Sequence, residues 1–395
     1  MNRIALRVVV AVVLGGGALL VSAAAEETHS IRGELWDERV PFPRRQDIAY
    51  VPGATDVMVH RARGDGFNFL HDSAIVAHKG MLVAAWYNCP QAEMVGTSII
   101  RARRSLDDGR TWSEPEVVAA DRDKQNIMYV PVALYSHHGV LHAFITRMKG
   151  GPDLVYACEA FVLDEKADQW TSRGVITGPF IANCPPQPLA DGNFLMAGRM
   201  AEKPGQKPTI PAVAISDGDD LTRPWRLVPM APAVEVKKDP RIVFPETTVL
   251  VERDQLTALM RRERDGSLLF FSRDQGRTWT GPQGHNFPMD SSKIYAGVLS
   301  AGQRYVLCNL PGGQVRRDML VIAVSRPGET TFSKLWKIRD GYSRELNAGP
   351  EWSYPSAIEH QGVLYVVYTS EKRHCVMTSI PVKQLAEGSK PDSAH

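Results

Sequence analysis

The stretch FPETTVLVERDQLTALMRR, residues 244–262, places an acid and two bases at the ends of apolar strands. Glu246 opens the stretch beside a proline, and Arg261 and Arg262 close it. A carboxylate can take a proton from a reacting group, and an arginine fork binds another carboxylate through two hydrogen bonds. The pattern therefore indicates a general base, Glu246, near an anion-binding arginine, either Arg261 or Arg262. The alternative is that Glu246 caps a turn and both arginines are solvated.

Further arginines stand at the ends of apolar segments. Arg147 follows FIT, Arg199 follows LMAG, and Arg316 and Arg317 precede the run MLVIAVS. Because neighbouring residues on a strand point to opposite faces, we expect only one of the last two, Arg317, to reach a shared site. If the strand ends meet, these arginines form a basic pit in a chain whose net charge is only +2. Otherwise each arginine pairs with a local acid.

The elements that position these groups recur along the chain. The period is about 55 residues, which is typical of a propeller with one four-stranded blade per repeat. After the N-terminal segment there is no long apolar pattern with the helical period, so the sequence predicts an all-β, six-bladed propeller. The six strands on which this rests each follow a turn residue, and these residues are Gly80, Gly139, Gly192, Asp254, Gly302 and Gly362.

A polar turn is also repeated between the strands. SLDDGRTW begins at Ser105 and SRDQGRTW at Ser272. In such a turn the Ser and Asp side chains bond nearby backbone N–H groups, the glycine adopts a positive φ, and the tryptophan packs into the blade. We therefore expect the turns to be scaffold, although Asp107 and Asp274 offer carboxylates. Weaker versions of the turn end at the aromatic residues Trp170, Trp225 and Phe332.

The turn S-x-D-x-G-x-T-W is the Asp-box, and the chain resembles the sialidase (neuraminidase) superfamily in its bacterial BNR-repeat branch. The resemblance covers nearly all of the chain after the N-terminal segment. It implies a sialidase-like propeller that hydrolyses sialosides at its axis. It also implies a site in which three arginines hold the substrate carboxylate. In that site a tyrosine attacks the anomeric carbon with help from a glutamate, and an aspartate handles the leaving-group proton.

The resemblance assigns these roles to particular residues. The segment EWSYPSAIEHQGVLYVVYT is similar to the one that holds the nucleophile, and Tyr354 stands in the matching place. Glu246 matches the partner glutamate, while Arg261 or Arg262 and then Arg317 match two of the three arginines. A neutral phenol is a poor nucleophile and needs such a base. A tyrosine also avoids setting a full negative charge against an acidic sugar.

The chain departs from the family pattern at two places. At the place of the family's first arginine stand His71 and Asp72, and the nearest arginines, Arg61 and Arg63, lie several residues earlier. If the protein cleaves sialosides, His71 or another group replaces that arginine. Between that strand and the first Asp-box the only carboxylate is Glu93. Glu93 and Asp72 are therefore both candidates for the acid, and the third possibility is neither. Trp86 and Tyr87 are either a stacking wall for a sugar ring or part of the core, and Arg199 is a further candidate for the substrate-binding face.

Our first hypothesis is a retaining exo-α-sialidase in which Tyr354 forms a covalent intermediate with the sugar. Because the first arginine is missing, a uronic acid or another nonulosonate is an alternative acidic sugar. Two rival hypotheses stay open. One is a different glycan-active enzyme, either a uronate hydrolase or a polysaccharide lyase, and the other is a propeller that binds glycans without turnover. The expected partner is a glycan with an acidic terminal sugar, and we expect a monomer.

Composition and motifs exclude several other classes. No basic run stands out in the sequence, so nucleic acid is not an expected partner. The histidines lack a metal-binding spacing such as H-E-x-x-H, and neither G-x-G-x-x-G nor a P-loop occurs. We therefore expect no catalytic metal and no nucleotide cofactor.

The chain ends predict export and a single large domain. Residues 1–25 combine a basic start, an apolar core and an Ala-x-Ala end, which is typical of a secretory signal peptide; an uncleaved anchor helix is the alternative. The protein is then secreted or periplasmic, and we expect no membrane span once the signal peptide is cleaved. Its five cysteines could form one or two disulfides. We expect an extended lead-in over 26–46, the propeller over 47–382 and a loose polar tail over 383–395.

Overall fold

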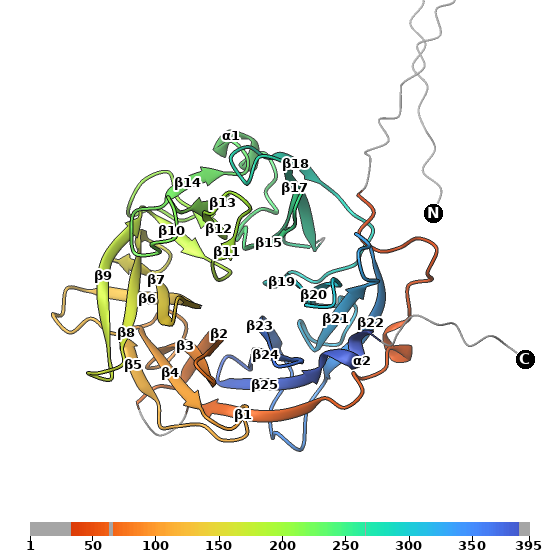
Figure 1. The fold of residues 1–395 in the computed structure, drawn as a ribbon, viewed down its shortest axis with the longest axis horizontal. Coiled ribbons are helices and arrows are strands. Elements are labelled where there is room, and N and C mark those ends of the chain that lie inside the picture. Colours follow the sequence, from red (N-terminus) through yellow and green to blue (C-terminus); the bar gives the residue numbers. More distant parts are fainter. Residues whose placement is uncertain (1–32, 63–65, 265, 387–395) are drawn as a thin grey trace, which may run out of the picture. The chain divides into compact units, whose positions relative to one another are not determined.

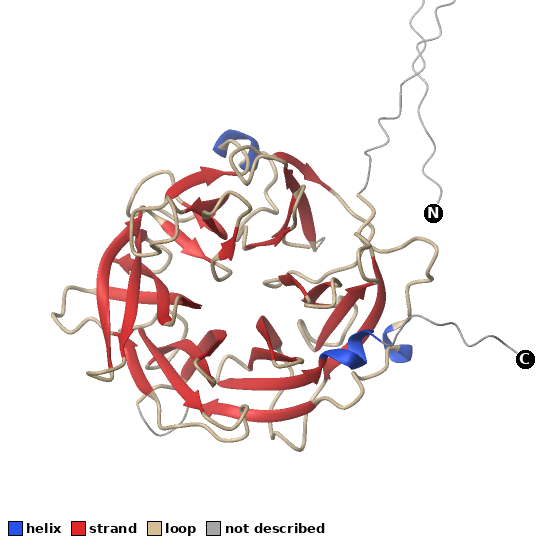
Figure 2. Cartoon of the chain, in the orientation of Figure 1, coloured by secondary structure: helices blue, strands red, loops and turns tan. Residues whose placement is uncertain are grey.

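The computed structural model describes residues 33–62, 66–264 and 266–386. It shows the predicted all-β, six-bladed propeller, with six antiparallel sheets around a common axis (Figures 1 and 2). All six strands predicted from the repeat are present, and each is the second strand of its blade. In the described part of the chain the helical elements are three short ones: the 3-10 turn η1 (Arg45–Asp47), α1 (Ala233–Val236) and α2 (Val382–Ala386).

Each blade starts near the axis and runs outward, strand by strand (Figure 1). The first blade consists of β2 (Phe69–His78), β3 (Met81–Cys89), β4 (Ile99–Ser105) and β5 (Glu116–Ala119). The second consists of β6 (Ile127–His137), β7 (Val140–Lys149), β8 (Val155–Asp164) and β9 (Gln169–Thr177). The third has five strands: β10 (Phe180–Ala182), β11 (Gln187–Pro188), β12 (Phe194–Met200), β13 (Ile210–Ile215) and β14 (Arg226–Pro229).

The remaining blades follow the same order. The fourth consists of β15 (Thr247–Val251), β16 (Leu256–Arg261), β17 (Ser267–Ser272) and β18 (Thr280–Gln283). The fifth consists of β19 (Tyr295–Val298), β20 (Arg304–Asn309), β21 (Met319–Ser325) and β22 (Phe332–Asp340). The sixth consists of β23 (Trp352–His360), β24 (Val363–Ser370), β25 (His374–Pro381) and β1 (Thr55–Arg61).

The sixth blade joins the two ends of the described chain. Its outermost strand β1 comes before the first blade in the sequence and pairs antiparallel with β25, the last strand (Figure 1). The ring is therefore closed by backbone hydrogen bonds between segments that lie more than 300 residues apart in the numbering. Closure also covers the edge that β25 would otherwise expose, and exposed sheet edges favour aggregation.

The apolar strands predicted from the sequence are buried on both faces because every blade packs between two neighbours. The sequence LTALMR of β16 is buried at all six positions, and β3 is buried at every position after its first. A sheet that is covered on both faces has no solvent side, so its strands read as continuous apolar runs rather than as an alternation. One core cluster accordingly joins strands of the first blade, such as β3, to strands of the second, such as β7.

The repeated polar turn is scaffold, as predicted. In the first copy the Ser105 hydroxyl accepts the backbone N–H of Gly109 at 2.8 Å. The Asp107 carboxylate accepts the backbone N–H of Thr111 at 2.8 Å and its hydroxyl at 2.6 Å. The Trp112 indole N–H then donates to the Gly109 carbonyl at 3.0 Å. The turn SRDQGRTW repeats all of these contacts, so its carboxylate is also committed to its own backbone.

The segments at the two ends of the propeller pack against it. In the lead-in, described from residue 33, Leu35 and Trp36 are buried and their backbone N–H groups donate to Asn286. The predicted tail starts with α2, whose Leu385 is buried, so ordered structure continues beyond residue 382. The predicted signal peptide and the last part of the tail lie outside the described residues.

Two further predictions concern cysteines and membranes. All five cysteines are buried free thiols, so the structure contains neither of the disulfides that export would permit. Burial raises the pKa of the Cys375 thiol to about 12, which makes this side chain a small apolar group rather than a nucleophile. Among the described residues no helix is long and apolar enough to cross a bilayer.

Candidate active site

A pocket of about 340 Å³ lies at one end of the axis and receives side chains from all six blades. Because the inner strands converge there, groups that are far apart in the sequence become neighbours. The pocket is where the structure brings together most of the site residues predicted from the sequence. In blade order its walls include Asp72, Val130, Ile181, Glu246, Arg317 and Tyr354.

A bulge in the inner strand aims two of these side chains into the pocket. In β2 the pairing register shifts between residues 71 and 74, and in β23 it shifts between residues 353 and 356. The first extra residue of the bulge is Asp72 in β2, with a φ of 51°, and Tyr354 in β23, with a φ of 58°. Bulges redirect side chains and positive φ is uncommon outside glycine. The same shift in β6 brings Val130 to the pocket wall.

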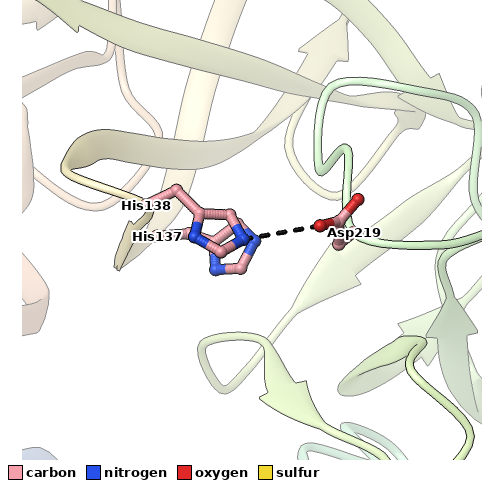
Figure 3. Close-up of side chains that lie close together, drawn as sticks. All are labelled: His137, His138 and Asp219. Atoms are coloured by element: carbon pink, nitrogen blue, oxygen red, sulfur yellow. Dashed lines mark ion pairs between the residues drawn. The ribbon is translucent and has the colours of Figure 1, made fainter.

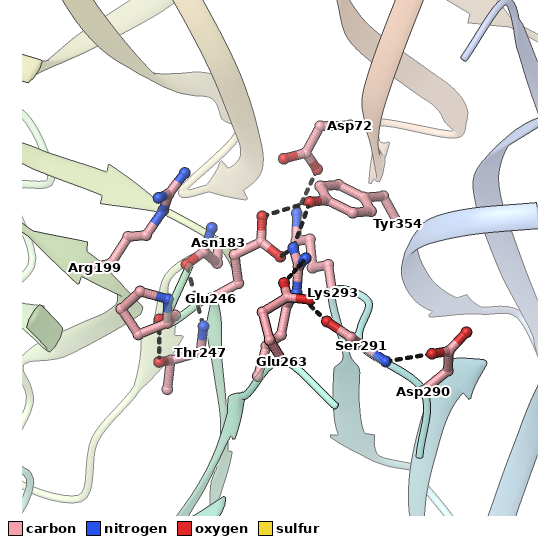
Figure 4. A network of polar contacts seen from close by, with 12 residues as sticks. Asp72, Asn183, Arg199, Glu246, Thr247, Glu263, Asp290, Ser291, Lys293 and Tyr354 are labelled. Atoms are coloured by element: carbon pink, nitrogen blue, oxygen red, sulfur yellow. Dashed lines mark hydrogen bonds and ion pairs between the residues drawn. The ribbon is translucent and has the colours of Figure 1, made fainter. Parts of the chain in front are cut away.

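Tyr354, Glu246 and Arg261 form one buried hydrogen-bonded group. The Tyr354 hydroxyl donates to Glu246 Oε1 at 2.7 Å, and Arg261 Nη1 donates to Glu246 Oε2 at 2.8 Å and to the Tyr354 oxygen at 3.0 Å. Figure 4 shows Glu246 reaching toward the phenol of Tyr354. The strands β15 and β16 pair antiparallel, so the start of one lies beside the end of the other. This register explains why a glutamate before the first strand meets an arginine that ends the second.

The charges in this group favour an ionised glutamate and a neutral phenol. Burial alone would raise the pKa of Glu246, but the charges of Arg261 and Arg199 outweigh it, and the pKa lies below its ordinary value. Burial raises the pKa of Tyr354, and the neighbouring Glu246 charge raises it further, while Arg261 and Arg317 oppose both. At neutral pH the phenol therefore keeps its proton and points it at a carboxylate that can accept it.

Arg317 approaches the tyrosine from the fifth blade. Its guanidinium lies 5.4 Å from the centroid of the Tyr354 ring, and it donates to Glu351 and to the Ser291 carbonyl, both at 3.2 Å. Its Nε is buried and has no hydrogen-bond partner among the described residues. The neighbouring Arg316 is mostly exposed, so the expectation that only Arg317 reaches the site agrees with the structure.

At the sequence position where the resemblance places the first arginine, Asp72 forms an ion pair. Asp72 bonds to the ammonium group of Lys293, and both side chains are buried. Lys293 comes from the segment before β19 and lies 5.8 Å from the centroid of the Tyr354 ring. Burial raises the pKa of Asp72 although Lys293 opposes the shift. Sequence reasoning missed Lys293 because it is a single lysine in an irregular segment, with no pattern around it.

His71 does not take the place of that arginine either. Its ring packs against Tyr354 with centroids 4.1 Å apart, and it does not line the pocket. Burial and the nearby positive charges, first Lys372 and then Arg317, hold the pKa of His71 well below its ordinary value. The imidazole is therefore neutral at physiological pH, and it supports the tyrosine instead of binding an anion.

Both acid candidates line the pocket, at different depths. The side chain of Glu93 is 39% exposed. Its carboxylate accepts a hydrogen bond from the Lys372 ammonium group at 2.8 Å and another from the Tyr87 hydroxyl at 3.1 Å. The side chain of Asp72 is only 6% exposed. Glu93 therefore lies nearer the solvent, where a leaving group would depart, and Asp72 lies deeper.

Besides His71 and Arg316, three more residues considered in the sequence lie outside the pocket. Trp86 is fully buried, stacks on His60 with ring centroids 4.8 Å apart, and donates to Asn88, so it is core and not a sugar platform. Arg262 points away from the site and pairs with Asp239 at 3.5 Å, which leaves Arg261 as the arginine of that pair in the pocket. Arg147 pairs with Glu159 at 2.7 Å. It lines a separate groove between the first two blades.

Arg199 lines the pocket, together with residues that the sequence did not single out. These are Asp153 from the loop between β7 and β8, Asn183 after β10, and Phe244 ahead of Glu246. They lie on irregular segments, where neither a strand period nor a known motif marks them. Figure 4 shows Arg199 and Asn183 on the opposite side of Glu246 from Tyr354.

One group of side chains away from the pocket is arranged to share a cation. The ligand atoms of His137, His138 and Asp219 all lie within 4.8 Å of one another, and His138 Nε2 is 3.4 Å from Asp219 Oδ2 (Figure 3). Strand β6 begins at the pocket and ends at His137. Val130 and His137 are seven steps apart along this strand, which corresponds to about 20 Å. The group is thus remote from Tyr354.

The six blades and their arrangement define a sialidase-like propeller with a pocket at its axis. The chain belongs to the family of BNR repeat-like domains, whose family pattern matches residues 80–366. No curated protein sequence matches the chain. The family resemblance inferred from the Asp-boxes is therefore confirmed.

Solved structures share the fold at low sequence identity. A Hadza microbial sialidase is 17% identical, with a TM-score of 0.66 over 83% of this chain and 69% of that one. A Trypanosoma rangeli sialidase in complex with sialic acid is 13% identical, with a TM-score of 0.62 over 86% of this chain. This chain spans only 60% of the Trypanosoma protein. A Dyadobacter fermentans protein of unknown function is 17% identical, with a TM-score of 0.62, and is covered over 99% of its length.

Proposed function

We propose that the protein is a retaining exo-glycosidase that removes a terminal acidic sugar, with a sialoside as the first substrate to test. One observation carries the proposal. The Tyr354 hydroxyl donates to Oε1 of the buried Glu246 carboxylate at 2.7 Å, and Arg261 donates both to the other oxygen of that carboxylate and to the Tyr354 oxygen. A phenol that is paired with a base and sits beside a cation at the floor of a pocket is equipped to attack an electrophilic carbon.

The proposed reaction has two steps. In the first, the Tyr354 oxygen forms a bond to the anomeric carbon, its proton passes to Glu246, and the bond to the leaving oxygen breaks while that oxygen takes a proton from an acid. In the second, water attacks the anomeric carbon, the acid residue now accepts a proton from the water, and Glu246 returns its proton to the departing tyrosine. Two displacements at one carbon give net retention.

The substrate carboxylate is proposed to lie between Arg261 and Arg317. Both guanidinium groups flank Tyr354, one through its oxygen and the other at its ring face. Arginine is suited to this role because its fork meets a carboxylate with two parallel hydrogen bonds. Lys293 is a third positive charge nearby, but Asp72 largely neutralises it. The clamp thus resembles that of a sialidase in two of its three members.

Glu93 is the proposed acid because it stands at the open side of the pocket. A leaving group must exit towards solvent, and the exposed Glu93 is the carboxylate nearest that route, whereas Asp72 is buried in its ion pair. Because Asp72 lies deeper in the pocket, it is better placed to support the bottom of the pocket than to deliver a proton to a departing group.

Turnover of a fluorogenic sialoside, measured beside the matching glucuronide, tests the proposal. The wild type should release the fluorophore from one of the two, and Tyr354→Phe should abolish release because the variant has no nucleophilic oxygen. Tyr50→Phe, which alters an exposed tyrosine, is the matched control and should behave like the wild type. A folded wild type that cleaves neither substrate contradicts the exo-glycosidase proposal.

A different glycan enzyme or a glycan-binding propeller is the second candidate, and the Asp72–Lys293 pair is the observation that favours it. In the sialidase pattern an arginine at this sequence position binds the substrate carboxylate. In this chain the position holds Asp72, and the positive charge of Lys293 is paired with it. A lyase would release an unsaturated sugar that absorbs in the ultraviolet, whereas a binder would retain acidic glycans without turnover. Screening polysaccharides by ultraviolet absorbance and by affinity electrophoresis separates these outcomes.

Location and assembly belong to the same proposal. We propose that residues 1–25 direct export and that the protein works as a monomer on glycans outside the cytoplasm. Expression in a bacterial host with intact-mass measurement of the exported protein tests the first point, since cleavage removes the N-terminal segment. Light scattering of the purified protein tests the second.

A further inference from the structure

Arg199 and Asp153 face each other in the pocket wall without satisfying each other. The shortest contact between Arg199 Nη2 and Asp153 Oδ1 is 3.8 Å, which is too long for a hydrogen bond. Arg199 also reaches the Pro208 carbonyl, but only at 3.5 Å. Arg199 Nε and Asp153 Oδ1 are both buried and have no hydrogen-bond partner within the described residues.

These two groups form a built site rather than a chance surface pair. The side chain of Arg199 is 8% exposed and that of Asp153 is 17% exposed, and both line the pocket. Arg199 comes from β12 in the third blade, and Asp153 comes from the β7–β8 loop of the second blade, where its φ is 60°. Buried polar groups are normally satisfied, because leaving a donor or an acceptor unpaired is costly. A half-satisfied pair in a pocket wall therefore points to a ligand.

An aromatic ring connects this pair to the proposed reaction centre. Phe244 is 37% exposed and lines the pocket. The guanidinium of Arg199 lies 5.3 Å from its ring centroid, and that of Arg261 lies 5.5 Å from it. Because both guanidinium groups lie this close to the same ring, their separation cannot exceed the sum of the two distances. That upper limit is comparable to the length of one monosaccharide with a short side chain. A sugar held by Arg261 at one end can therefore reach Arg199 at the other.

The chemistry of the pair selects its ligand. A carboxylate or sulfate would gain from Arg199 but would be repelled by Asp153, and an ammonium group would meet the opposite conflict. A hydroxyl group can donate to Asp153 Oδ1 and accept from Arg199 in the same position. Two adjacent hydroxyls can divide these bonds between them.

We infer that Arg199 and Asp153 form a hydroxyl-binding subsite for the part of the terminal sugar that is remote from its carboxylate. The inference rests on the proposed function and narrows its substrate class to polyhydroxylated sugar acids. Phe244 supports the apolar face of the sugar between the two ends. A site with buried groups that need a hydroxyl discriminates strongly against an analogue without it, so this subsite sets specificity, while Arg261 and Arg317 supply affinity for the acid.

The test compares binding of two carboxylates by isothermal titration calorimetry. One probe is N-acetylneuraminic acid, a polyhydroxylated sugar acid, and the other is cyclohexanecarboxylate, which has the acid but no hydroxyl. The proteins are the wild type, Asp153→Leu, Asp153→Asn and the control Asp217→Asn, which alters an exposed aspartate of the third blade. Asp153→Asn keeps the size of the side chain, so it serves as the readout if Asp153→Leu fails to fold.

The subsite predicts a change in selectivity. In Asp153→Leu the sugar acid should bind on the order of 10- to 100-fold more weakly, because Arg199 is then left beside an apolar group. Asp153→Asn should give a smaller loss in the same direction. Cyclohexanecarboxylate should bind all four proteins equally, since its contacts are with Arg261 and Arg317.

The outcomes separate this inference from the proposed function. An unchanged ratio of the two affinities in both Asp153 variants overturns the subsite, whether or not the wild type cleaves sialosides. A changed ratio without turnover supports the subsite and contradicts the glycosidase. Failure of the wild type to bind the sugar acid, with cyclohexanecarboxylate bound, overturns the subsite, and failure to bind either probe overturns both.

Discussion

Replacement of Glu246 by glutamine is the most direct perturbation of the proposed mechanism. The carboxylate accepts the Tyr354 proton at 2.7 Å, and glutamine keeps the shape and a hydrogen bond to the phenol but cannot take the proton. A positioned general base contributes about 10²–10⁴ in rate. At about 1.4 kcal/mol per tenfold, the barrier should rise by about 3–5 kcal/mol.

The same change has a calculable effect on stability. Removing one partner of a buried ion pair typically costs about 3–5 kcal/mol. Arg261, however, keeps a second partner, because its Nη2 donates to Glu263 at 2.5 Å. The amide oxygen of the substituted side chain can still accept from Arg261, so we expect a loss of about 1–2 kcal/mol in the free energy of unfolding. The variant should therefore be folded at 25 °C, and its rate loss can be read as chemistry.

The assay is the pH dependence of kcat and KM on the fluorogenic sialoside. The pKa of Glu246 in the folded protein lies below its ordinary value. The carboxylate is therefore ionised at and above the ordinary glutamate pKa, and it loses its ability to act as a base only as the pH falls through the lower, folded-state pKa. Wild-type kcat should therefore hold at mildly acidic pH and drop below about 4.3, the ordinary glutamate value. Glu246→Gln should lack this acid limb and have an unchanged KM.

A control and a refuting result complete the experiment. Glu345→Gln changes an exposed glutamate and should keep wild-type kinetics. If Glu246→Gln retains kcat within tenfold of the wild type, Glu246 is not the base and the hydrogen bond to Tyr354 is structural. If KM rises while kcat is constant, the residue acts on substrate binding, and the assignment of roles in the pocket is wrong.

Three further predictions concern the scaffold and its charges. Asp274→Ala should lower the free energy of unfolding by about 1–2 kcal/mol in urea denaturation, because it frees four turn donors. Wild-type stability should also fall below pH 4, because the pKa of Asp274 is lowered to about 2 and its contribution is lost as the pH falls through that value. Lys293→Met should destabilise more at pH 8 than at pH 5, because the pKa of Asp72 is raised and an unpaired Asp72 takes up a proton in acid. EDTA should leave turnover unchanged, since the histidine group at the end of β6 is remote from the pocket; a loss of activity that Zn²⁺ restores contradicts this.

The fold could be predicted because each blade carries a short-range sequence pattern of its own. An apolar strand follows each turn residue, and the polar turn with its tryptophan pins the outer part of the blade. Both are short-range patterns that the sequence shows directly. Glu246 and Arg261 were predictable for a related reason, since an antiparallel pair sets the start of one strand beside the end of the next.

The rest of the site depends on geometry that the sequence does not display. The choice between Trp86 and Tyr87 as the pocket residue follows from the bulge in β2, which lies opposite Trp86 and could not be located beforehand. Lys293 and Asp153 lie on irregular segments, and only the arrangement of the blades brings them to Tyr354 or Arg199. Of the alternatives Arg261 and Arg262 the structure places Arg261 in the pocket, and of the two interpretations of Trp86 it supports the core.

Ring closure has a consequence for the order in which the protein becomes active. The wall behind Tyr354 is His71, and these rings meet across the junction between the sixth blade and the first. Until the last blade has been synthesised, β1 has no β25 to pair with, and the tyrosine that completes the site is absent. An incomplete chain thus holds the anion-binding residues of the middle blades without a nucleophile. Such long-range pairing is slow to form, so the competence to react is expected to appear late, after the whole ring has closed.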